Sequence, residues 1–293
     1  MPVLGDFCMH NTRTSPRFSL AHLTVLGCSP PEMTQIAART GYDFVSFRGA
    51  ALGLPQEPVY ALGSDRKLLR ETRDALADTG IRLLDMELAM LCGAIEPASY
   101  LPVMEVTAEL GGRHFIASAW TSDKVLVTDR FAELCDLAAP FGLTMDFEFV
   151  SIANVSTLGE AVAMVRRANR PNAGLLIDTI HFAWSRSALD ALDHLPRDWF
   201  HFAHLCDGPP RRPSTLPEMI GVVREGRSNL GEGGIDVAAI LRHLPDIPYS
   251  LESPSARLTR EVGPEEVARR CIDVARRYLE ESSVGSASPS SAR

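Results

Sequence analysis

Four residues of the kind that bind metal ions stand near the ends of successive apolar stretches in the second half of the chain. They are Glu148, Asp178, His204 and Glu252, separated by 30, 26 and 48 residues. Buried carboxylates are costly without a compensating charge, and three together raise one another's pKa. A divalent cation removes this objection, because carboxylate oxygens and a neutral imidazole are suitable ligands for it. The pattern predicts one metal site, provided that the fold brings these stretches to one point.

Short apolar runs alternate with amphipathic stretches of ten or more residues along nearly the whole chain. This alternation favours repeated strand-helix units and a parallel sheet. We expect strands at 18–26, 42–48, 81–89, 113–119, 143–149, 173–182, 200–208 and 248–253. We expect helices at 29–40, 64–79, a segment ending near 109–112, 129–142, 157–169, 188–195, 235–244 and 264–281.

Eight such units predict an α/β fold of one closed (β/α)8 barrel, the TIM barrel. A doubly wound open sheet is the alternative, and it is weakened because no G-x-G-x-x-G follows the first strand. We expect one catalytic domain over 1–282 and a flexible Ser-rich tail over 283–293. In a barrel the carboxyl ends of the strands form one mouth, where the four predicted ligands would meet.

Each of these residues also has an interpretation without chemistry. A lone acid at a strand end often caps the next helix, which would suit Asp178 or Asp207. His204 could be a satisfied histidine of the core or rim, and Glu252 could pair with an arginine. Four successive strands would then need four unrelated explanations, so we favour the shared site.

Other polar residues are expected around the same mouth. His181, just past the strand that carries Asp178, would face the substrate, and Asp207 is a second candidate for proton transfer. Arg48 and Glu87 come late in their strands and are candidates for substrate binding. A buried Arg–Glu pair across neighbouring strands is an equally good interpretation of these two residues.

The segment 208–234 is the longest irregular stretch, and loops of that length are usually functional. Arg211 and Arg224, together with Arg212 and Arg227, could donate forked hydrogen bonds to a carboxylate or a phosphate, or could be solvated. Three polar residues elsewhere are expected to be structural: Asp146 lies one layer below Glu148, His114 begins a strand at the end away from the mouth, and His201 is a core or rim histidine.

Charge and cysteine content restrict the partners. Acids number 37 against 29 Lys and Arg, a net charge of −8, which argues against a nucleic acid as partner. The six cysteines form no C-x-x-C pair, which is typical of reduced, cytoplasmic thiols. No apolar run approaches membrane-spanning length, so no membrane partner is expected.

The chain resembles the xylose isomerase-like barrel superfamily, which includes sugar phosphate isomerases and epimerases. The resemblance covers nearly the whole chain and is carried by MDFEF, LLIDTIHF, HFAHLCDG, LGEGGID and YSLES. As a set these motifs are specific for the superfamily and poor at separating its activities.

The resemblance implies one divalent metal, commonly zinc, manganese, magnesium or cobalt, held by Glu148, Asp178, His204 and Glu252. In members that move a proton between neighbouring carbons, two glutamates also act as acid and base, and Glu148 and Glu252 match those positions. The superfamily also contains dehydratases and hydrolases. Its DNA-cleaving branch uses a histidine-rich three-metal cluster, whereas this sequence offers ligands for one metal.

The leading hypothesis is a metal-dependent isomerase or epimerase acting on a small sugar-like hydroxy-ketone. The alternative is a metal-dependent dehydratase or hydrolase, such as an epoxide hydrolase, acting on a small hydroxy or dicarboxylic acid, with His181 or Asp207 assisting. The expected partner is accordingly a polyol, a keto-sugar or a hydroxy acid. A non-catalytic subunit is the least supported reading, and a homodimer is possible because such barrels often pair through their outer helices.

Overall fold

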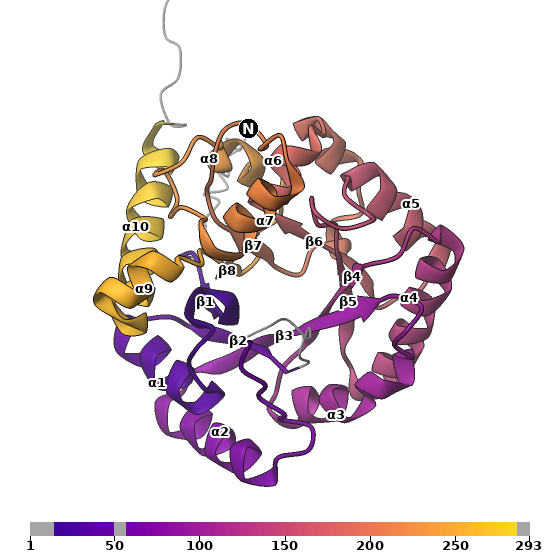
Figure 1. Cartoon of the computed structure of the whole chain (residues 1–293), viewed down its shortest axis with the longest axis horizontal. Coiled ribbons are helices and arrows are strands. Elements are labelled where there is room, and N and C mark those ends of the chain that lie inside the picture. Colours follow the sequence, from indigo (N-terminus) through magenta and orange to yellow (C-terminus); the bar gives the residue numbers. More distant parts are fainter. Residues whose placement is uncertain (1–14, 50–56, 286–293) are drawn as a thin grey trace, which may run out of the picture.

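Eight parallel strands form a closed barrel in chain order in the computed structural model, which describes residues 15–49 and 57–285 (Figure 1). The strands are β1 (Phe18–Ala21), β2 (Phe44–Arg48), β3 (Arg82–Leu91), β4 (His114–Ala119), β5 (Thr144–Glu148), β6 (Ala173–Asp178), β7 (Ala203–Leu205) and β8 (Tyr249–Leu251). β1 pairs with both β2 and β8, which closes the ring. The predicted (β/α)8 barrel is confirmed.

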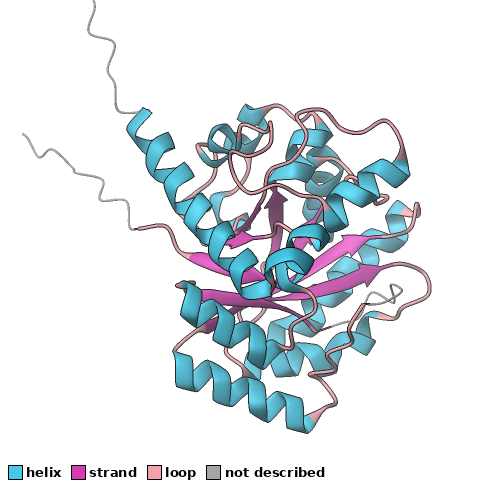
Figure 2. Ribbon diagram, turned by 60° about the vertical axis from the view of Figure 1, so that its left-hand side comes forward, coloured by secondary structure: helices cyan, strands magenta, loops and turns pink. Residues whose placement is uncertain are grey.

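Helices surround the barrel and connect its strands (Figure 2). They are α1 (Pro30–Thr40), α2 (Arg66–Thr79), α3 (Leu101–Glu109), α4 (Lys124–Ala138), α5 (Leu158–Ala168), α6 (Thr179–Ser185), α7 (Leu216–Glu225), α8 (Val237–Leu241), α9 (Ala256–Val262) and α10 (Pro264–Gly285). Short 3-10 turns are η1 (His22–Val25), η2 (Pro97–Tyr100), η3 (Ala139–Phe141), η4 (Leu189–His194) and η5 (Arg197–Trp199). None of the helices in the described ranges is long and apolar enough to cross a membrane.

Several predicted strands were too long, and those expected at 200–208 and 248–253 are only Ala203–Leu205 and Tyr249–Leu251. In two other cases the element that follows explains the difference. The strand expected at 173–182 ends at Asp178, whose carboxylate accepts the N–H groups of Ile180 and His181 and so caps α6. The strand expected at 18–26 ends at Ala21, where η1 begins, so His22 is not in mid-strand.

Several helix predictions also need correction. The stretch 208–234, expected to be irregular, contains α7, which a capping box of Thr215 and Glu218 starts. α4 begins at Lys124 rather than at 129, because Asp123 accepts the first free N–H groups. The segment 188–195 forms only the 3-10 turn η4, and α9 was not predicted. The tail expected at 283–293 lies mostly outside the described residues, and α10 continues to Gly285.

The barrel interior is apolar in one part and polar in another. Since side chains alternate along a strand, residues of β2, β3, β4 and β6, with one residue just before β7, form a small inner cluster distinct from the main core between sheet and helices: Phe44, Leu84, Leu88, Ile116, Leu176 and Phe202. A polar group lies beside it, in which Ser46 Oγ contacts Ser19 Oγ at 2.8 Å and Ser250 Oγ at 3.2 Å and donates to Asp85. The interior can therefore hold ionisable groups near its mouth.

The junction of β1 and β8 fixes one rim of the mouth. Thr24 Oγ1 donates to the Leu251 carbonyl at 2.9 Å and accepts the Ser253 N–H at 2.9 Å. These bonds lie on both sides of Glu252 and hold its backbone.

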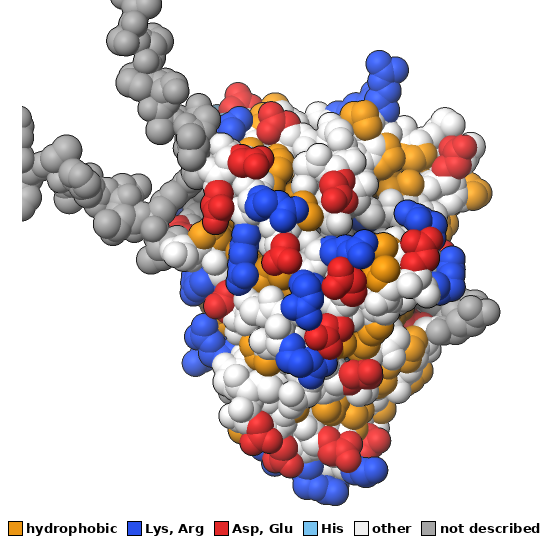
Figure 3. Space-filling model, turned by 90° about the vertical axis from the view of Figure 1, so that its left-hand side faces the viewer, with side chains coloured by type: hydrophobic (Ala, Val, Ile, Leu, Met, Phe, Trp, Pro, Cys, Tyr) orange, Lys and Arg blue, Asp and Glu red, His pale blue; other side chains and the backbone are white. Residues whose placement is uncertain are grey.

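On the outer face over α1, α9 and α10, positive and negative side chains alternate (Figure 3), with pairs such as Arg39–Glu265 at 2.8 Å and Arg270–Glu266 at 2.7 Å.

We predict that His22 makes the protein acid-sensitive. Burial lowers the pKa of His22 to about 4, while its ring bonds the Cys28 carbonyl and the Arg48 N–H. Below pH 6.5, the ordinary pKa of histidine, His22 binds a proton in the unfolded chain but stays neutral in the folded chain down to about pH 4, so acid favours unfolding. This residue should lower the free energy of unfolding by about 3 kcal/mol between pH 7 and pH 4.

Urea unfolding at several pH values gives the free energy of unfolding of the wild type and of His22→Gln as a function of pH. The contribution of His22 is the difference between the slopes of these two curves. The exposed His194→Gln variant is the control and should keep the wild-type slope. Equal slopes for wild type and His22→Gln would contradict the prediction.

Candidate metal centre and active site

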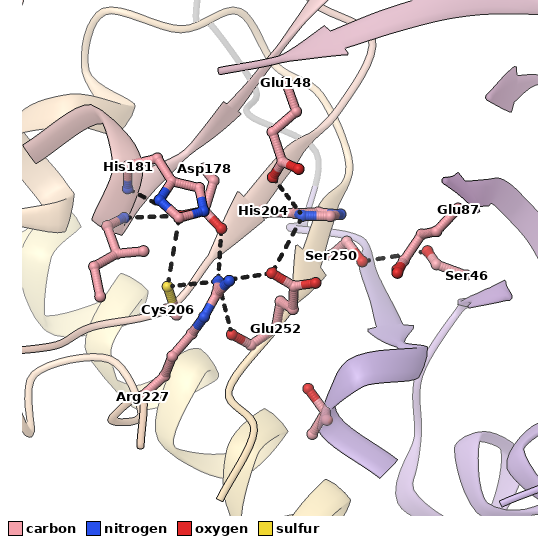
Figure 4. Close-up of polar contacts among 12 residues, drawn as sticks. Ser46, Glu87, Glu148, Asp178, His181, His204, Cys206, Arg227, Ser250 and Glu252 are labelled. Atoms are coloured by element: carbon pink, nitrogen blue, oxygen red, sulfur yellow. Dashed lines mark hydrogen bonds and ion pairs between the residues drawn. The ribbon is translucent and has the colours of Figure 1, made fainter. Parts of the chain in front are cut away.

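The structure brings the four predicted ligands together at the carboxyl mouth of the barrel (Figure 4). Glu148 ends β5, Asp178 ends β6, His204 lies in β7 and Glu252 follows β8. Strand register sets Asp178 directly beside His204. One ligand atom from each residue lies within 4.8 Å of the others, and all four residues are buried.

Arg227 completes this cluster. Its Nη1 lies 2.6 Å from Asp178 Oδ2 and 2.7 Å from Glu252 Oε2, and its side chain is 2% exposed (Figure 4). The guanidinium therefore offsets part of the negative charge of the carboxylates. In the sequence Arg227 stood out only as one of four loop arginines. The available signal was its place just before the LGEGGID turn, which packs back against the end of β7.

Asp207 holds the loop that carries Arg227. Both of its carboxylate oxygens accept backbone N–H groups at 2.7 to 3.1 Å, and these donors belong to Gly208, Gly231, Gly233 and Ile235. A Cβ at Gly233 would lie 2.3 Å from Asp207 Oδ1, so this approach needs glycine. With its oxygens engaged in this way, Asp207 acts as a loop anchor, in contrast to the proton-transfer role expected from the sequence.

Electrostatics within the cluster are uneven. Burial raises the pKa of Glu148, against the opposing effect of His204. Burial would also raise the pKa of Glu252, but Arg227 and His204 hold that pKa well below its usual range. Burial would lower the pKa of His204, yet Glu252 and Glu148 raise it well above 6.5. The cluster is thus short of positive charge and draws a proton onto its imidazole.

The donor set fits a divalent cation. Among the described residues, Glu148 Oε1 and both ring nitrogens of His204 are buried without a hydrogen-bond partner. His204 Nδ1 lies 3.5 Å from Glu148 Oε1 and 3.6 Å from Glu252 Oε2, too far for hydrogen bonds. Buried polar atoms without partners are rare, and each costs about 1–3 kcal/mol. A cation bound by the carboxylates and the imidazole would satisfy these atoms.

Arg48 and Glu87 lie at the same mouth and form the buried pair that was one of the two sequence interpretations. Arg48 Nη2 is 3.0 Å from Glu87 Oε2, and its Nη1 is 2.9 Å from Glu57 Oε1. Figure 4 places Glu87 on the side of His204 away from Asp178. The positive charge of Arg48 is thus matched by two carboxylates.

His181 lies on α6, one turn beyond Asp178. Burial lowers its pKa to about 4, so the ring is neutral. The Ser151 N–H donates to His181 Nδ1 at 3.3 Å, with the Ser151 hydroxyl at 3.0 Å. Because Nδ1 accepts, the ring proton resides on Nε2, which makes His181 a hydrogen-bond donor. Ser151, which sets this tautomer, was not predicted.

The remaining two predicted substrate-binding residues are not gathered with the cluster. Arg211 is exposed, and Arg224 is partly buried on α7. Within the described part of the chain, neither forms an ion pair or hydrogen bond with the four ligands. Their neighbour Arg212 instead donates to the Ser151 carbonyl at 3.4 Å.

Comparison with known proteins agrees with this geometry. A family profile described as "Xylose isomerase-like TIM barrel" matches residues 34–278. Inosose isomerase of Bacillus subtilis is 28% identical over 195 residues, which cover 60% of this chain and 68% of that protein. The 3-dehydroshikimate dehydratase of Pseudomonas aeruginosa is 27% identical over 127 residues, 43% of this chain but 19% of that protein.

Solved structures share the fold. The IolI protein, crystallised with a bound zinc atom, has a TM-score of 0.73 and 21% identity, with 91% of this chain and 99% of that chain covered. The D-allulose 3-epimerase of a Methylomonas species, in complex with D-allulose, has a TM-score of 0.67 and 19% identity, with 90% and 97% covered. At these identities the likeness establishes the fold alone.

We predict that Arg227→Met destabilises the metal-free protein by about 3–5 kcal/mol, because Asp178 and Glu252 lose their buried counter-charge. Urea unfolding in the presence of a chelator measures this loss. The control is Arg257→Met, which removes an exposed pair with Glu261 and should change stability little. Wild-type stability for Arg227→Met would show that the carboxylates do not depend on this cation.

Proposed function

Because the chain belongs to the xylose isomerase-like TIM barrel family, we propose that it is a divalent-metal-dependent isomerase or epimerase of a small sugar-like hydroxy-ketone. One observation carries the proposal: Glu148 and Glu252 approach His204 Nδ1 at 3.5 and 3.6 Å within a buried four-ligand cluster. The similarity to inosose isomerase and the shared fold with a D-allulose epimerase support it.

Glu148, Asp178, His204 and Glu252 are the residues that would hold the metal, consistent with the unpartnered buried atoms of Glu148 and His204. A bound divalent cation would supply Lewis-acid polarisation of substrate oxygens. Zinc, manganese, magnesium and cobalt all suit a set of carboxylates and imidazole.

In the proposed reaction Glu148 and Glu252 handle protons at carbon. One glutamate takes the proton from the carbon that carries the hydroxyl group, and a glutamate returns a proton to the neighbouring carbon in isomerisation, or to the opposite face of the same carbon in epimerisation. In isomerisation the hydroxyl proton also passes to the former carbonyl oxygen, so that the hydroxyl becomes the new carbonyl. Neither side chain is more than 10% exposed, so bulk water has little access to the transferred proton. His181, neutral and with its proton on Nε2, donates a hydrogen bond to a substrate oxygen.

The charges around the mouth favour an uncharged substrate. Arg48 is matched by Glu57 and Glu87, and Arg227 is matched by Asp178 and Glu252. Neither buried guanidinium is therefore free to bind a substrate carboxylate without giving up an existing ion pair. A neutral polyol or keto-sugar suits this arrangement better than the dicarboxylic acid considered from the sequence.

A dehydratase is the second candidate, and the tautomer of His181 favours it. In an elimination, one glutamate would take the proton next to the carbonyl, and the other would give a proton to the departing hydroxyl, which leaves as water, while His181 Nε2–H donates a hydrogen bond to that hydroxyl. The partial similarity to 3-dehydroshikimate dehydratase points the same way.

We expect the metal-loaded protein, incubated with an inosose in heavy water, to exchange hydrogen for deuterium at the carbon next to the carbonyl and to form the isomeric ketone. Glu148→Gln and Glu252→Gln should each slow this exchange by about 100-fold or more, because each removes a proton carrier. Proton NMR with time follows both exchange and product.

Glu225→Gln, an exposed change on α7, is the control and should exchange at the wild-type rate. A panel of inososes and ketoses that shows no exchange with zinc, manganese, magnesium or cobalt would exclude the isomerase. Release of water from 3-dehydroshikimate by the same protein would select the dehydratase instead.

A further inference from the structure

A second group of metal-ligand side chains lies at the opposite end of the barrel. His114 begins β4, Asp146 is the third residue of β5, and His201 stands two residues before β7. One ligand atom from each lies within 4.8 Å of the others. Because these are the amino-terminal parts of the strands, the group is separate from the Glu148 cluster at the carboxyl mouth and takes no part in the proposed reaction.

A buried carboxylate is the centre of this group. Asp146 is 1% exposed, and its Oδ1 lies 2.6 Å from His201 Nδ1 while its Oδ2 lies 3.7 Å from His114 Nδ1. The Thr144 hydroxyl donates to Asp146 Oδ2 at 2.8 Å and contacts His114 Nδ1 at 2.8 Å. The two imidazole rings stack with centroids 5.1 Å apart and an interplanar angle of 22°. Two imidazoles and one carboxylate thus converge.

A glycine of the neighbouring strand β6 leaves room for this group. A Cβ at Gly174, on β6, would lie 2.3 Å from Asp146 Oδ1 and 2.7 Å from His201 Nδ1. Real Cβ atoms do not approach that closely, so any other residue would push the carboxylate and the imidazole apart. Consecutive elements of the barrel therefore close around the same few polar atoms.

Access from solvent remains on one side. The side chains of His114 and His201 are 16% and 22% exposed, whereas Asp146 is covered. Two histidines and one carboxylate are a common protein ligand set for zinc, and a solvent-facing edge leaves a coordination position for water. We propose that His114, Asp146 and His201 form a second site for a zinc-type divalent ion, which ties together the amino ends of β4, β5 and β7.

The test is the number of zinc ions bound per chain. The full-length, tag-free protein is stripped with a chelator and titrated with zinc by calorimetry, with metal content checked by mass spectrometry. We expect about two ions per chain in the wild type and about one in His114→Gln, in His201→Gln and in Asp178→Asn, which loses the other site. Anomalous diffraction at the zinc edge should place a peak among the three ligands.

His243→Gln is the matched control, because His243 forms a His–Asp contact with Asp193 at 2.9 Å but belongs to no group of three metal-ligand side chains among the described residues. It should bind about two zinc ions, like the wild type. Retention of the second ion in both His114→Gln and His201→Gln would overturn the proposal. So would a zinc-soaked wild-type crystal without an anomalous peak at this group, which would leave Asp146 as a hydrogen-bonding link alone.

Discussion

Three buried carboxylates that meet at one barrel mouth must be matched by positive charge, and much of the surrounding structure follows from this requirement. Arg227 contacts two of them, and His204 lies between the third and Glu252. These partners are incomplete, because Glu148 Oε1 and the imidazole nitrogens have no hydrogen-bond partner in the described ranges. A divalent cation would supply the remaining charge without adding bulk, which is why these residue types are suited to a metal.

The closed barrel of parallel strands explains why ionisable residues so distant in sequence lie close enough to affect one another's charge. Each strand ends at the same rim, and neighbouring register sets Asp178 against His204 and His204 against Ser250. Short-range patterns are enough to find the strands, so the barrel and the convergence of Glu148, Asp178, His204 and Glu252 at its mouth were predictable from the sequence. The alternation of side chains then decides which residues of each strand enter the barrel.

Features that depend on long-range contacts were less accessible. Asp178 was considered either as a ligand or as a helix cap, and the structure gives it both surroundings, because one oxygen caps α6 while the other faces Arg227. The hydrophobic pattern continues smoothly from β6 into α6, so the strand was predicted too long. Arg227 could not be separated from three other loop arginines, since its place is set by the contacts of Asp207 with a distant turn.

Those contacts have an architectural consequence. Asp207 joins the end of β7 to the turn at 231–235, so residues 208–230 form a loop whose two ends are held together at its base. α7 lies within this loop, and Arg227, which follows it, donates from Nε to the Val223 carbonyl at 2.8 Å, while the four candidate ligands lie outside the loop. Exchange of residues 209–225 for another sequence would therefore remove a support of Arg227, and with it the counter-charge of Asp178 and Glu252, although the strands that carry these carboxylates lie elsewhere in the chain.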